Sequence, residues 1–152
     1  MSANSTITER IVLTLWVGAI WSIGYIAAPV LFKFSPTREL AGNLAGEMFT
    51  AVSFIGIACA FILIISLIFK PAGQRFTQWR LWVVILMLAI TLVGQFALSP
   101  VMQELKHAGI AEGTEAARQF GRLHGIASIL FLINSLSGLA LVIFGMRPQS
   151  GS

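Results

Sequence analysis

The sequence predicts an all-α integral membrane protein, a bundle of four helices that each cross the bilayer. Hydrophobic residues make up 57% of the 152 residues and charged residues only 11%, whereas soluble domains carry roughly 25% charged residues. Four mainly apolar runs also reach the length of about 20 residues that a helix needs to span a bilayer. Lipid offers the backbone no hydrogen-bond partner and the runs do not alternate, so helices are expected and a β-barrel is not.

The expected spans are residues 11–32, 48–69, 81–101 and 123–146. They form one transmembrane domain, residues 11–146, between a short N-terminal segment, 1–10, and a short tail, 147–152. The first run is too long for a cleaved signal peptide, so we expect it to be retained. Ser35 is expected to cap the helix that leads to the second span, with Pro36 as its first residue. Residues 112–122 are expected to form a helical lead-in to the fourth span.

The charge pattern favours a membrane partner over nucleic acid. The formal net charge is +4, and the basic residues stand singly at the ends of apolar runs, where lipid headgroups lie. No nucleic-acid motif accompanies them. Lys and Arg divide evenly between the two sides of the predicted topology. The connection that carries Lys70, Arg75 and Arg80 holds no acid, which favours cytoplasmic termini and placement in the cell (inner) membrane.

The two halves of the chain resemble each other at an offset of 71 residues. The segment 25–31 aligns with 96–102, so that Pro29 stands opposite Pro100, and Phe49 and Phe120 follow the two prolines at equal spacing. Each half is a two-span hairpin, so both halves enter the membrane in the same direction. This pattern is typical of tandem parallel repeats about an axis normal to the membrane. Chance similarity between two apolar stretches is the alternative.

Polar side chains within the spans are expected to face the bundle interior, because hydrocarbon penalises them. Helical spacing places Thr14, Gly18, Trp21 and Tyr25 on one face of the first span. The candidate polar pocket lies towards the loops opposite the termini and comprises Tyr25, Ser53, Gln95, Ser99, His124, Ser128 and Asn134. We expect His124, Gln95 and Tyr25 to face one another there, with Asn134 deeper. Interhelical hydrogen bonding without a working pocket is the alternative.

His124 is the candidate for chemistry inside the spans. An imidazole there could carry a proton or bind haem or a metal, but each role needs partner groups. The other histidine, His107, lies in the predicted long loop, and the spans offer no Cys–His cluster and no paired carboxylates. No catalytic residue, metal site or cofactor is therefore expected, with haem at His124 as the alternative.

Small and aromatic residues indicate helix packing and membrane anchoring. Two Gly-x-x-x-Gly segments, at Gly42 and Gly46 and at Gly121 and Gly125, predict close approach between helices. Further membrane helices or a second copy of the chain are the expected protein partners. Tryptophans near basic residues are expected to anchor the spans at the interface; they are Trp16, Trp79 and Trp82.

The segment Arg118 to Ser128, which contains Phe120 and the pair His124–Gly125, resembles the transmembrane protein 205-like family (domain of unknown function 4149), as does Asn134 beyond it. The likeness extends over residues 10–145 and includes Pro29–Phe32 and Cys59–Ile62. It implies a four-span fold, highlights His124, Gly125 and Asn134, and implies no settled activity. The chain also shows a weaker likeness to four-span haem proteins of the protoporphyrinogen-oxidase and copper-resistance types. Those proteins carry a histidine near their first span, and this chain has none in span one.

These observations together favour a non-enzymatic membrane scaffold or a transport-related protein. A haem-binding or redox membrane protein that uses His124 is the competing hypothesis.

Overall fold

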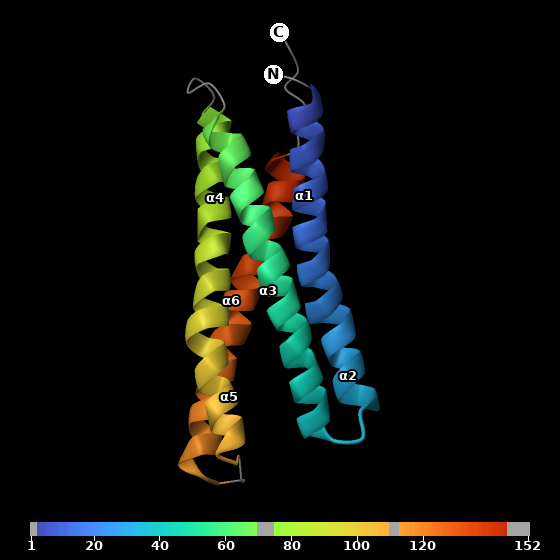
Figure 1. The fold of residues 1–152 in the computed structure, drawn as a ribbon, viewed down its shortest axis with the longest axis vertical. Coiled ribbons are helices and arrows are strands. Elements are labelled where there is room, and N and C mark those ends of the chain that lie inside the picture. The colour runs from blue at the N-terminus through green and yellow to red at the C-terminus, as the bar shows by residue number, and fades with distance from the viewer. Residues whose placement is uncertain (1–2, 70–74, 110–112, 146–152) are drawn as a thin grey trace.

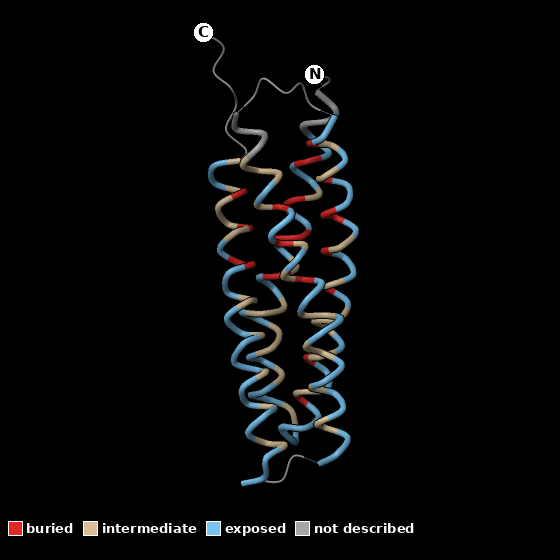
Figure 2. The backbone as a smooth tube through the Cα atoms, turned by 90° about the vertical axis from the view of Figure 1, so that its left-hand side faces the viewer, coloured by how far each residue is buried: buried red, intermediate tan, exposed pale blue. Residues whose placement is uncertain are grey.

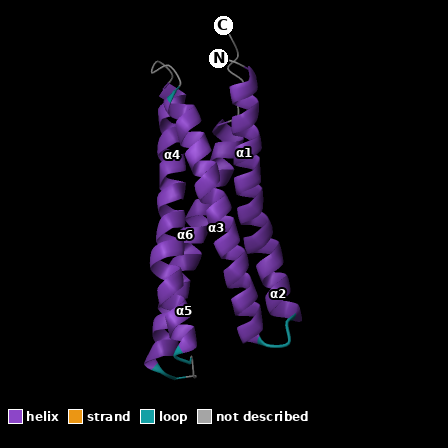
Figure 3. Cartoon of the chain, viewed as in Figure 1, coloured by secondary structure: helices purple, strands orange, loops and turns teal. Residues whose placement is uncertain are grey.

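The computed structural model describes residues 3–69, 75–109 and 113–145, and nearly all of them are helical (Figure 3). The elements in chain order are α1 (Ala3–Trp21), the π-helix η1 (Ser22–Ala27), α2 (Ala28–Phe34), α3 (Arg38–Ile68), α4 (Arg75–Leu92), the π-helix η2 (Val93–Leu98), α5 (Ser99–His107) and α6 (Glu115–Gly145). The segments α1–η1–α2 and α4–η2–α5 each run on as one rod. Within the described residues, these two rods, α3 and α6 are the four helices long and apolar enough to cross a membrane, which confirms the predicted all-α four-helix membrane bundle.

The four rods form a ring in which each packs on two neighbours. Helix α1 packs against α3 and α6, and α4 packs against the same two helices, so α1 and α4 occupy opposite corners (Figure 1). Helices α1 and α4 begin, and α3 and α6 end, at one end of the bundle, which we call the terminal end. The other end, with residues 35–37, 108–109 and 113–114, is the loop end. There α2 lies beside α3 and α5 beside α6, and the two pairs diverge (Figure 1).

The helices extend beyond the apolar runs from which the spans were predicted. Helix α3 begins at Arg38, and its N-cap is Thr37, whose Oγ1 accepts a hydrogen bond of 3.2 Å from the Leu40 amide. The expected N-cap at Ser35 is therefore wrong, because Ser35 and Pro36 lie in the preceding bend. The predicted long loop between the expected spans 81–101 and 123–146 is shorter, since α5 continues to His107 and α6 begins at Glu115. Residues 70–74 of the connection between spans two and three, and the tail 147–152, lie outside the described residues.

Two π-helices interrupt the rods 71 residues apart, at Ser22–Ala27 and Val93–Leu98. A proline follows each of them in the first turn of the next α-helix, Pro29 in α2 and Pro100 in α5. Proline lacks an N–H and its ring crowds the carbonyl four residues earlier, which here belongs to the π-helical turn. The wider π-turn accommodates both effects, so each rod continues without a break.

The apolar core is concentrated towards the terminal end (Figure 2). On α1 the buried stripe is Leu13, Trp16, Val17 and Ile20, and on α4 the residues Val84, Met87 and Thr91 are buried. Trp16 is 1% exposed and fills the space beside Gly56 of α3, so its predicted role as an interfacial anchor is wrong. Trp82, by contrast, is 69% exposed. The buried positions 13, 16 and 20 recur 71 residues later at 84, 87 and 91, which adds to the similarity between the rods.

Candidate functional site: polar contacts between the helices

A buried ionic cluster near the terminal end joins three helices. Glu9 of α1 is only 3% exposed. Its Oε1 accepts a hydrogen bond of 2.6 Å from the Ser66 hydroxyl of α3, and its Oε2 lies 3.3 Å from Arg80 Nη2 of α4. Carboxylates are almost never fully buried unless they are paired. The contact therefore ties the opposite corners α1 and α4 together through the bundle.

The Arg80 side chain also lies close to the end of α6. Its Nε atom is buried and has no hydrogen-bond partner among the described residues. A Cβ added to Gly145 would lie 3.3 Å from this Nε, so the end of α6 passes closely over the guanidinium because residue 145 has no side chain. The cluster thus depends on all four rods.

Near the middle of the bundle, Tyr25 connects the first half of the chain to the second. Its hydroxyl donates a hydrogen bond of 3.1 Å to Oγ of Ser135, a residue of α6 that is 1% exposed. The Tyr25 ring also packs against Phe131 at 5.7 Å between centroids, and Phe49 contacts Phe131 edge-on at 5.5 Å. Gly24 of η1 leaves the space that the Phe131 ring occupies.

Asn134, beside Ser135, forms a second buried contact, which joins α6 to α4. It is 7% exposed, and its Nδ2 donates a hydrogen bond of 3.3 Å to Thr91 Oγ1, which in turn donates one of 2.8 Å to the Met87 carbonyl. The Oδ1 atom of Asn134 is buried without a partner among the described residues. An unsatisfied buried acceptor costs about 1–3 kcal/mol.

At the loop end, Lys106 of α5 reaches across to α3. Its Nζ donates hydrogen bonds of 3.2 Å to the Gly42 carbonyl and 3.3 Å to Asn43 Oδ1. The same ammonium lies 5.9 Å from the ring centroid of Phe120 on α6. Contacts therefore join the first two rods, α1–η1–α2 and α3, to the last two, α4–η2–α5 and α6, at the terminal end, in the middle and at the loop end.

The predicted polar pocket is brought together only in part. Tyr25 reaches Ser135 of α6, whereas Asn134, the residue before Ser135 on the same helix, is buried and reaches Thr91 of α4. His124 is exposed and stacks on Phe120 of its own helix at 6.0 Å. The Ser128 and Ser53 hydroxyls donate to backbone carbonyls of their own helices, and Ser99 accepts a hydrogen bond from Gln103. Gln95 is half-buried and has no side-chain hydrogen bond among the described residues.

Two further expectations about helix faces differ from the structure. The face with Thr14, Gly18, Trp21 and Tyr25 is exposed, and the alternate stripe of α1 packs inward. A Cβ at Gly46, Gly121 or Gly125 would meet nothing within 4 Å, and one at Gly42 would meet only side chains, at 3.7 Å or more. Close backbone packing at these four glycines within the chain is therefore wrong, because the two halves diverge at that end.

Sequence reasoning missed Glu9 and Ser66 as members of a buried polar contact. Thr91 and Ser135 share helical faces with the candidate residues Gln95 and His124, but the candidate pocket did not include them. A usable signal existed for Glu9, since the 71-residue offset pairs this acid with the base Arg80. The residues described here contain no group of three or more His, Cys, Asp or Glu side chains that could hold a metal ion.

One family comparison bears on this chain. A family model described as a domain of unknown function (DUF4149) matches residues 11–111. No curated protein and no solved structure matches the chain.

Proposed function

The chain belongs to the DUF4149 family, whose function is unknown, and we propose that it is a non-enzymatic, transport-related protein of the membrane. In this proposal two repeated halves, residues 3–69 and 75–145, hinge about their packed terminal end and separate at their loop end. The narrower likeness to transmembrane protein 205 is part of the proposal and is not needed for it.

The pattern of contacts between the halves carries this proposal. The terminal end holds the buried Glu9–Arg80 pair and most of the core, whereas the loop end is bridged by Lys106, a long and flexible side chain. Transporters built from parallel repeats move one half against the other around a site near the midplane. Tyr25, Ser135, Asn134 and Thr91 supply polar groups at that depth, and π-helices are frequent at functional sites.

The repeat itself rests on three features with one spacing. The π-helices, the prolines that follow them and the buried residues of α1 and α4 all recur after 71 residues. The bridge between Glu9 and Arg80 has the same spacing. Residues related by a twofold axis can touch each other only close to that axis, so the ion pair would mark the axis of the repeat.

Spin-label distances in lipid vesicles test the hinge. One label pair, at Arg38 and Arg118, spans the halves at the loop end, and the control pair, at Ile11 and Trp82, spans them at the terminal end; all four residues are exposed. We expect a broad loop-end distribution that moves to longer distances in Lys106→Gln, and a narrow terminal-end distribution that does not change. Equally narrow distributions that ignore Lys106→Gln would refute the hinge.

A membrane scaffold is the second candidate, and the open glycine faces favour it. Gly121, His124, Gly125 and Ser128 share an exposed stripe of α6, and small residues of this kind allow close packing of a further helix. Photo-crosslinking from residue 125 in native membranes separates the candidates. A specific protein adduct together with a rigid loop end would favour the scaffold.

Haem binding at His124 remains the competing enzyme-type hypothesis, and we predict that the purified protein carries no stoichiometric haem. The imidazole is exposed and its ring contact is with Phe120, and haem ligation generally requires an axial ligand set that stabilises the iron. A Soret band that disappears in His124→Ala would overturn this prediction.

A further inference from the structure

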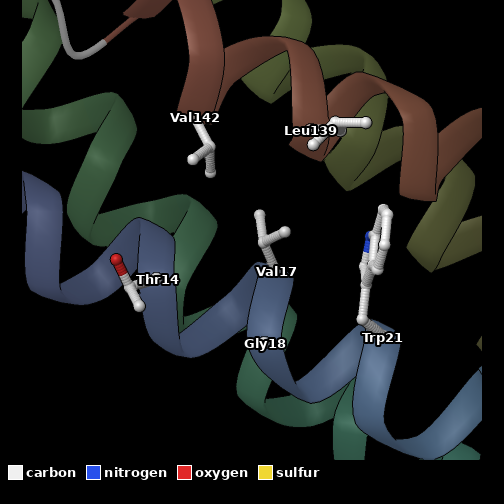
Figure 4. Close-up of a pocket in the computed structure, with 6 residues that line it drawn as sticks. All are labelled: Thr14, Val17, Gly18, Trp21, Leu139 and Val142. Carbon is white, nitrogen blue, oxygen red and sulfur yellow. The ribbon is translucent and has the colours of Figure 1, made fainter.

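The seam between α1 and α6 contains an apolar groove with a volume of about 320 Å³. Val17, Gly18 and Trp21 of α1 line one wall, with Thr14 at the terminal end, and Leu139 and Val142 of α6 line the other. Val17 points across the seam towards α6, and the Trp21 indole stands at the loop-side end (Figure 4). An engineered apolar cavity of about 150 Å³ holds benzene, so the volume of this open groove is enough for a hydrocarbon group.

The groove is open on the side where hydrocarbon lies. It falls within the candidate spans Ile7–Phe34 and Glu115–Gly145, and Gly18 is exposed with nothing within 4 Å of an added Cβ. From Thr14 to Trp21 the groove follows α1 for roughly 10 Å, at about 1.5 Å per residue. Its surroundings in the membrane are therefore lipid chains, and its shape suits one chain laid along the helix.

A cation stands beyond the terminal end of this groove. Arg10 is exposed and precedes Thr14 and Gly18 at helical spacings of four and eight, which places it on the same face of α1. It lies about one turn closer to the membrane boundary than Thr14. Arginine binds phosphate oxygens through charge-assisted and often bidentate hydrogen bonds.

We propose that the α1–α6 seam binds an anionic phospholipid, with one acyl chain in the groove beside Gly18 and the phosphate at Arg10. The apolar walls recognise the chain, and Arg10 gives the preference for a net negative headgroup. This site is separate from the polar contacts between the halves and does not depend on the proposed hinge.

Native mass spectrometry of the detergent-purified chain tests the proposal with dioleoyl phosphatidylglycerol and dioleoyl phosphatidylcholine as probes. We expect the chain to retain phosphatidylglycerol in preference to phosphatidylcholine. An added Cβ at Gly18 has nothing within 4 Å. Gly18→Leu places a side chain in the groove and should weaken retention of phosphatidylglycerol by about tenfold or more. Arg10→Gln should leave chain binding in place and remove the preference between the two lipids.

Gly125→Leu is the matched control, because Gly125 is an equally open, exposed glycine in a span but lies outside the groove. It should retain phosphatidylglycerol as the wild type does. Equal retention of both lipids by the wild type, or full retention by Gly18→Leu, would overturn the proposal. A dimer that Gly18→Leu dissociates would also overturn it, since the groove would then hold a second copy of the chain.

Discussion

Glu9 and Arg80 are 71 positions apart in the sequence and meet as a buried ion pair, with 3.3 Å between Oε2 and Nη2. Their side chains are 4% and 18% exposed. The pair lies on α1 and α4, the opposite corners of the ring, and thereby closes the terminal end of the bundle. The two residues occupy the same position in the two copies of the proposed repeat. One copy has an acid there and the other a base, so the two similar rods carry opposite charges where they meet.

Removing either charge of this pair should destabilise the bundle strongly. Glu9→Gln leaves the Arg80 charge buried, and Arg80→Gln leaves the Glu9 charge buried, each at a cost of about 3 kcal/mol. The double variant leaves neither charge alone and should recover part of that loss. Unfolding in detergent micelles measures all three. Arg118→Gln is the control, because its pair with Glu115 spans 3.8 Å between exposed side chains and should contribute less than about 1 kcal/mol. Additive losses in the double variant would contradict the pairing.

The Tyr25 hydroxyl should contribute a single interhelical hydrogen bond. Tyr25→Phe keeps the ring against Phe131 and removes the donor to Ser135, so we expect a loss of about 1 kcal/mol. Ser135→Ala combined with Tyr25→Phe should cost less than the sum of the single variants, since both remove the same bond. Ser128→Ala should be silent, because that hydroxyl bonds only its own helix. Equal effects of Tyr25→Phe and Ser128→Ala in an unfolding assay would argue against the contact.

Substitutions at Asn134 and at Thr91 should differ in their effect on the stability of the protein. Asn134→Leu removes a buried Oδ1 that has no partner among the described residues, and Thr91 keeps its bond to Met87, so stability should hold or rise. Thr91→Val removes the acceptor of Asn134 Nδ2 and leaves that amide buried, at a cost of about 1–3 kcal/mol. Thermal unfolding of the two variants beside the wild type provides the comparison. Asn134→Leu as the more damaging change would reveal a partner of Oδ1 beyond those described.

Alanine substitutions at Gly138 and at Gly46 should change the stability of the protein in opposite directions. A Cβ at Gly138 would lie 2.8 Å from Val17 Cγ2 in the core, so Gly138→Ala should destabilise by about 1–3 kcal/mol through overpacking. A Cβ at Gly46 meets nothing within 4 Å, so Gly46→Ala should stabilise by up to about 1 kcal/mol through helix propensity. The melting temperatures of the two variants decide this point, and destabilisation by Gly46→Ala would show that α3 packs more closely there than described.

Hydropathy predicted the four spans because a membrane imposes length and apolarity on each helix independently of its neighbours. The rotation of each helix was harder to predict. In α1 the stripe with Leu13, Trp16 and Val17 packs inward, and the stripe with Thr14, Gly18 and Trp21 was expected to do so. Both stripes are mainly apolar, so the sequence offers little contrast between the face towards lipid and the face towards protein.

The burial of residues in the candidate site was equally hard to predict from the sequence. Glu9 precedes the first apolar run, where an acid ordinarily faces water, and it becomes buried because Arg80 and Ser66 reach it from other helices. His124 lies in an apolar run and was expected inside, yet it is exposed because the loop ends of the halves diverge. These outcomes depend on contacts between distant segments and on the tilt of whole helices, which local spacing does not determine.

The most direct test of the two-half architecture is to divide the chain between residues 72 and 73 and express both fragments together, with an affinity tag on one. Each fragment holds a complete two-span half, and the Glu9–Arg80, Tyr25–Ser135 and Lys106–Asn43 contacts cross between them. We predict that the untagged fragment is purified with the tagged one from membranes, and that Glu9→Gln markedly reduces its yield. Fragments that both insert into the membrane but do not purify together would contradict the account.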